Sequence, residues 1–133
     1  MKLRKTMLTA ATLAVTAASA LTTTGTAAAT TSPPGGWDHV WTSRDGGAEV
    51  YVNRYKDNIS VCDVKKDGRS ARLEVYIEKA TKPVYTMTTS QCAIHWEPDG
   101  GKYNLPEGKE IHLYFGTGKG RDNLTHQKFL NNR

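Results

Sequence analysis

Strict alternation of apolar and polar residues is the feature that most constrains the fold of this chain. It is clearest in the segment 70–78, where the apolar positions are Ala71, Leu73, Val75 and Ile77. A period of two residues is typical of a β-strand that buries one face and exposes the other. The segments 48–55 and 109–115 alternate in the same way, so the chain is predicted to be built from strands.

Shorter strands are expected at 37–42, 59–64 and 84–89, and the segment 93–96 is ambiguous. Turn signals such as Asp67-Gly68 and Asp99-Gly100 recur roughly every 10 residues, as they do in all-β domains. No window carries apolar residues at helical spacing over three turns. The prediction is an all-β fold: a small antiparallel β-sandwich or barrel of about six or seven short strands with one disulfide.

The segment 1–29 has the organisation of a secretory signal peptide. Lys2, Arg4 and Lys5 precede an uncharged stretch at 7–21, and small residues end the segment at 27–29. Cleavage is expected after Ala29, with a second possible cut after Ala20. The apolar stretch is shorter than the roughly 20 residues of a membrane span. We therefore expect secretion into the extracellular medium without a membrane anchor.

The rest of the chain divides by composition into three parts. Residues 30–36 form a Pro/Gly linker, residues 37–115 the β-domain, and residues 116–133 a Gly-rich basic C-terminal tail in which 122–130 could form one helical turn. Removing the three basic residues of the signal from the 18 in the chain leaves 15 against 13 acidic ones, a net charge of +2. Because this excess is small, no nucleic-acid partner is expected.

Two cysteines, Cys62 and Cys92, lie in the expected mature part of the chain. An exported protein meets an oxidising environment, so an even pair of cysteines indicates a disulfide. A loop of this length gives a stabilisation of roughly 3.6 kcal/mol in the chain-entropy treatment. Since small domains are stable by only about 5–15 kcal/mol, the bond would matter greatly.

The segment 59–70 reads Ile-Ser-Val-Cys-Asp-Val-Lys-Lys-Asp-Gly-Arg-Ser. It resembles a pattern of small secreted single-disulfide β-domain proteins of actinobacteria, in which Val-Cys-Asp, an Asp-Gly turn and an alternating strand lead to a second Cys. The match runs from about Val50 to Cys92, less than half of the expected mature chain. The resemblance implies a β fold and a Cys62–Cys92 bond, and it implies no activity.

Catalytic candidates are few. His95 and Glu97 fall on the same side of a short strand, and His112 could neighbour them from the last strand, a trio that could bind a metal or carry out acid–base chemistry. Their spacing matches no zinc signature, so no metal and no cofactor is expected. A ribonuclease would need a base, an acid and a phosphate-binding cation, for which Glu74, His112 and Arg72 could converge.

Aromatic residues are the stronger indication of function, since the chain has three Trp and six Tyr. Tyr51, Tyr76 and Tyr114 fall on the polar phase of their strands, and Trp96 ends the ambiguous segment 93–96. If the three strands are neighbours, these tyrosines could form an exposed aromatic face that stacks on sugars or anchors a protein. Alternatively, that face packs against a second sheet.

These observations favour a monomeric, non-enzymatic secreted domain that binds an extracellular protein or a cell-envelope glycan. Two other classes of function stay open. One is a small secreted hydrolase, ribonuclease-like or using His95, Glu97 or His112. The other is an extracellular inhibitor or toxin that presents a loop such as 97–104.

Overall fold

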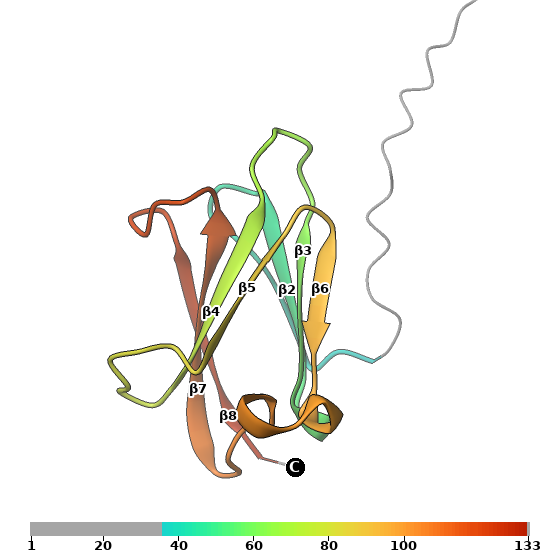
Figure 1. Cartoon of the computed structure of the whole chain (residues 1–133), viewed down its shortest axis with the longest axis vertical. Coiled ribbons are helices and arrows are strands. Elements are labelled where there is room, and N and C mark those ends of the chain that lie inside the picture. Colours follow the sequence, from blue (N-terminus) through green and yellow to red (C-terminus); the bar gives the residue numbers. More distant parts are fainter. Residues whose placement is uncertain (1–35, 133) are drawn as a thin grey trace, which may run out of the picture.

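The structure, a computed structural model, describes residues 36–132, which form a sandwich of two four-stranded antiparallel β-sheets (Figure 1). Sheet A has the order β1-β2-β3-β6, formed by His39–Thr42, Ala48–Asn53, Asn58–Asp63 and Cys92–His95. Sheet B has the order β5-β4-β7-β8, formed by Tyr85–Thr89, Ala71–Ile77, Lys109–Thr117 and Thr125–Asn131. The all-β prediction is confirmed, with eight strands rather than six or seven.

The core lies between the sheets and follows the alternation seen in the sequence. On β4, Ala71, Leu73 and Val75 are fully buried, and Val50 and Phe115 meet them from β2 and β7. Burial of one such side chain stabilises a fold by about 1.5–3 kcal/mol. The two sheets are therefore joined mainly by apolar packing.

The segment expected to be a basic tail instead completes sheet B. β7 continues to Thr117, and β8 pairs with it from Lys109↔Asn131 to Phe115↔Thr125. Both the tail and the helical turn at 122–130 are thus wrong predictions. β8 lies at the edge of sheet B, and Phe129 is its one large apolar side chain in the core of the described residues. The alternation of apolar and polar residues along β8 is therefore faint in the sequence.

The ambiguous segment 93–96 lies within and just after β6, at the edge of sheet A. Cys62 of β3 faces Cys92 of β6 in the strand register, and the two are joined in a disulfide with their Cα atoms 4.0 Å apart. The predicted bond is confirmed. It attaches the four-residue edge strand covalently to the centre of its sheet.

Two carboxylates, the partly buried Asp45 and the buried Asp57, hold the sandwich together at opposite ends. Asp45, in the β1–β2 turn, accepts bonds from the Thr117 backbone N–H (3.0 Å) and hydroxyl (2.6 Å) at the end of β7, and from the Ser43 hydroxyl. Asp57 accepts the Leu105 N–H (2.7 Å) and the Asn131 side-chain amide (2.9 Å). Each carboxylate therefore links segments far apart in the chain.

These hydrogen bonds stabilise the ionised form of Asp45. Partial burial opposes the charged form, but hydrogen bonds from Ser43, Thr117 and Gly47 outweigh burial and hold the pKa of Asp45 far below its ordinary value. Gly47 is required sterically at this place, since a Cβ atom on it would lie 2.4 Å from Cγ2 of Thr117.

Candidate functional site

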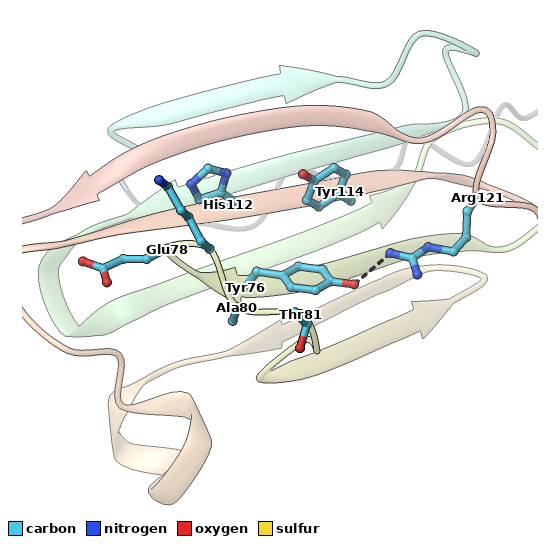
Figure 2. A pocket seen from close by; sticks show the side chains of 8 residues that line it. Tyr76, Glu78, Ala80, Thr81, His112, Tyr114 and Arg121 are labelled. Atoms are coloured by element: carbon cyan, nitrogen blue, oxygen red, sulfur yellow. Dashed lines mark hydrogen bonds between the residues drawn. The ribbon is translucent and has the colours of Figure 1, made fainter.

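The outer face of sheet B contains a shallow hollow of about 380 Å³. Its floor is formed by Tyr76 of β4 and by His112 and Tyr114 of β7 (Figure 2). The connection between β4 and β5 forms one wall, and Arg121 from the β7–β8 connection closes the opposite end. The lining residues are Tyr76, Glu78, Lys79, Ala80, Thr81, His112, Tyr114 and Arg121.

A buried carboxylate organises one end of the hollow. Glu74 is only 2 % exposed and lies between two guanidinium groups, which belong to Arg72 and Arg121. Arg121 Nη2 is 2.9 Å from Glu74 Oε2 and 2.8 Å from the Tyr76 hydroxyl, which itself donates to Glu74 over 2.8 Å. Burial and the neighbouring Glu74 charge raise the pKa of Tyr76, so its hydroxyl keeps the proton that it donates.

Arg72 also fixes the loop that carries Arg121. Its Nη2 pairs with Glu74, and its Nη1 donates to the Lys119 carbonyl over 3.1 Å. Two guanidinium groups share one carboxylate, so a single positive charge is left unbalanced at this end of the hollow.

The aromatic floor is already packed on itself. Tyr76 and Tyr114 meet edge to face with ring centroids 5.4 Å apart, and Tyr114 is stacked on His126 of β8 at 4.5 Å. Tyr76 is 6 % exposed and Tyr114 is half-buried. One face of the Tyr114 ring is therefore already covered by His126, and little of Tyr76 is open to a ligand.

Beside the hollow, polar side chains of β7 and β8 form a hydrogen-bonded row. Glu110 Oε1 is 2.9 Å from His112 Nε2, and His112 Nδ1 is 2.9 Å from His126 Nε2. The planes of the two imidazole rings are within 11° of parallel, and the ring centroids are 5.1 Å apart. This separation is close to the 2.9 Å between the facing nitrogens plus the distance from each centroid to its own nitrogen. The rings thus lie edge to edge and share one proton between the facing nitrogens.

Charge at this row is balanced. Lys128 lies 3.1 Å from Glu110 and, with His112, lowers the pKa of that carboxyl. The pKa of His126 is lowered by partial burial and by the neighbouring His112 and Lys128, which favours the neutral form of His126.

The predicted trio of His95, Glu97 and His112 does not come together. His95 belongs to sheet A, where its ring stacks on Tyr103 at 3.8 Å and its Nδ1 lies 3.0 Å from Asp99. Glu97 begins a single 3-10 turn, η2 (Glu97–Asp99), in the loop after β6, whereas His112 lies on the outer face of sheet B. Residues 36–132 contain no group of three or more His, Cys, Asp or Glu that could hold a metal ion.

The proposed ribonuclease residues do share one face, yet Glu74 is not available as a base. Arg72, Glu74 and His112 all lie on the outer face of sheet B. However, both oxygens of Glu74 accept hydrogen bonds, and its side chain is only 3 % exposed. A substrate proton cannot reach this carboxylate without dismantling the network.

The expected face of three tyrosines is also divided. Tyr76 and Tyr114 are in contact, but Tyr51 lies on β2 of sheet A, with its ring 5.5 Å from that of Trp37. Trp96 follows β6 and is 43 % exposed. The aromatic residues therefore belong to two separate surfaces, and no further sheet covers either one in the described part of the chain.

Sequence reasoning missed the cations and the second histidine of this site. Lys79 is in the β4–β5 connection, and Arg121 and His126 are in the segment that was expected to be a tail. Only the pairing of β8 with β7 brings His126 beside His112, and no local pattern marks that pairing.

Fold and site together define a small single-disulfide β-sandwich domain with a polar hollow on one outer face. Comparison of the chain with protein-family models, with curated proteins and with solved structures gave no match. No helix among residues 36–132 is long and apolar enough to span a membrane.

Proposed function

We propose that this protein is a secreted, non-enzymatic β-sandwich domain that binds a glycan of the cell envelope through the hollow on sheet B. Export is supported by the signal-like organisation of residues 1–29, which lie outside the described residues, and by the disulfide. The hollow is the observation that carries the assignment, because its volume lies within the range of small-ligand sites.

The lining of the hollow suits a polyhydroxylated ligand. Thr81, Glu78 and Lys79 supply donors and acceptors from one wall, and the rings of Tyr76 and Tyr114 supply an apolar floor. Sugars combine hydroxyl groups with C–H patches, so a site with both kinds of surface can hold one in a fixed orientation.

Binding is favoured over catalysis by the state of the acid–base groups. Glu74 is enclosed by three donors, and both ring nitrogens of His112 are in hydrogen bonds. A hydrolase needs at least one such group within reach of its substrate.

Retention on immobilised peptidoglycan and chitin tests the proposal. The Tyr114→Ala variant should lose retention, because it removes one of the two tyrosine rings of the floor. The Tyr55→Ala variant is the matched control, since Tyr55 is 65 % exposed and lies outside the hollow. No retention of the wild-type protein on either matrix would sink the proposal.

A protein partner is the second candidate, favoured by a different surface. Val40 and Ile94, at opposite edges of sheet A, are each 47 % exposed, and Trp96 is 43 % exposed. Exposed apolar side chains, Trp above all, are typical of the contact centres of protein interfaces. Affinity capture from culture medium, with Trp96→Ala as the variant that should lose the partner, distinguishes this candidate from glycan binding.

The hydrolase alternative rests on the hydrogen-bonded row of Glu110, His112 and His126. If it holds, turnover of RNA, glycans or peptides should be measurable and should disappear in His112→Ala. Equal turnover by wild type and this variant would reject the row as catalytic machinery.

A further inference from the structure

The hollow is flanked by positive charge that the protein does not neutralise. Glu78 is paired with Lys109 over 3.1 Å, and Glu74 is shared by two guanidinium groups. Lys79 has no ion-pair partner within residues 36–132. The lining therefore carries an unbalanced cation on the β4–β5 wall and another at the Arg121 end.

Arg121 is hydrogen-bonded to the Tyr76 hydroxyl at that end (Figure 2). Its Nη2 makes both of its hydrogen bonds, to Glu74 and to the Tyr76 hydroxyl, while its side chain stays 64 % exposed. Across the described range, Nε and Nη1 have no protein partner, so three N–H donors are available on a fixed planar group. Such a fork matches the two oxygens of a carboxylate or a phosphate.

The neighbouring Arg72 keeps Arg121 available. It satisfies Glu74 Oε1 and holds the Lys119 carbonyl, so the loop is fixed without consuming the remaining donors of Arg121. A guanidinium that is positioned in advance loses less conformational entropy when it binds an anion.

From this geometry we propose that the hollow accepts an anionic glycan whose phosphate or carboxylate groups pair with Arg121 at one end and with Lys79 on the β4–β5 wall. This inference rests on the proposed glycan function and specifies the chemistry that the site selects. Neutral sugars would offer the Arg121 donors hydroxyl acceptors only, without the negative charge that pairs with a guanidinium.

Three soluble probes test the inference by calorimetry or fluorescence titration: a glycerol-phosphate wall polymer, hexagalacturonate and chitohexaose. We expect one or both charged probes to bind and chitohexaose to bind at least tenfold more weakly. Arg121→Gln should weaken the charged complex roughly tenfold or more, since a hydrogen bond to a charged group is lost. Binding should also weaken as salt rises from 0.15 to 1 M, where screening shortens from about 8 to 3 Å.

Lys66→Gln is the matched control, because Lys66 is exposed in the β3–β4 connection, outside the hollow. Lys79→Gln is the second test variant, since the Lys79 side chain makes no hydrogen bond or ion pair within residues 36–132, and it should weaken binding even if Arg121→Gln proves unstable. Preference for the phosphate or the carboxylate probe identifies the source of the anion.

Two results would overturn the inference in distinguishable ways. If chitohexaose binds as tightly as the charged probes, and Tyr114→Ala abolishes binding while Arg121→Gln and Lys79→Gln do not, the glycan function stands and the anionic ligand is rejected. If no probe binds and peptidoglycan and chitin retain nothing, the glycan function itself fails.

Discussion

Replacement of Asp45 by alanine should remove one of the two main polar links between the sheets. The carboxylate holds the β1–β2 turn of sheet A against the end of β7 in sheet B. Thr117 is 8 % exposed, so its N–H and its hydroxyl would both lose a charged acceptor in a poorly solvated place.

The magnitude follows from those two donors. A hydrogen bond to a charged group contributes about 1.5–3 kcal/mol. Water can enter the space left by the side chain, so the lower end applies, and Asp45→Ala should lose about 3 kcal/mol. For a domain of this size each kcal/mol lowers Tm by about 4–8 °C, which gives a fall of about 12–24 °C.

Urea and thermal unfolding followed by tryptophan fluorescence measure this loss. Asp122→Ala is the control, since Asp122 is exposed, and it should stay within about 0.5 kcal/mol of wild type. A loss below about 1 kcal/mol for Asp45→Ala would refute the role of the carboxylate as a link.

The same link predicts a pH dependence with a definite sign. The pKa of Asp45 is lower in the folded state than in the unfolded state. The contribution of Asp45 to the free energy of unfolding is therefore complete above the unfolded pKa of about 3.9, and it is lost as the pH falls towards the folded pKa. The stability difference between wild type and Asp45→Asn should therefore be constant above about pH 5 and shrink below about pH 4. A difference that grows on acidification would contradict this.

Three further predictions concern stability. Replacing both Cys62 and Cys92 by alanine should lower the free energy of unfolding by about 3.6 kcal/mol in urea titrations, given a sequence separation of 30, and a loss under 1 kcal/mol would contradict the chain-entropy account. Asn131→Ala should lose about 2–3 kcal/mol in the same titrations, because it leaves Asp57 with one donor fewer, and Asn131→Asp should lose more through repulsion between carboxylates. Tyr85→Phe should be neutral or stabilising by up to about 1 kcal/mol in thermal unfolding, because the buried Tyr85 hydroxyl has no hydrogen-bond partner in the described structure; a clear loss would reveal one.

The sequence was sufficient to predict which residues of a strand share a face. The inward phase of β4 was read correctly because apolar residues occupy every second position over its whole length. Alternation gives the phase of a strand but not its neighbours. Tyr51 and Tyr76 have the same phase and yet lie on different sheets, because the chain passes from sheet A to sheet B between β3 and β4.

The candidate site was predictable only in part, for the same reason. Tyr76, Tyr114 and His112 were identified as candidates from their strands, and the structure brings them together. Arg121 was not, because its place depends on a salt bridge to Glu74, 47 positions earlier in the chain. The edge strand β8 was missed because an edge strand needs few apolar residues.

The position of the disulfide has a consequence for how the chain folds. In sheet A, β1–β2 and β2–β3 are pairings of consecutive strands, whereas β3–β6 joins strands separated by β4 and β5 of the other sheet. Pairings between distant segments are slow to form because the intervening loop must first be closed. Cys62 and Cys92 lie on the β3–β6 pairing. The disulfide therefore keeps the two ends of the intervening loop together, whereas in the reduced chain they must meet by diffusion before β6 can pair with β3. The reduced chain should refold into the same sandwich more slowly, with the docking of β6 as its late step.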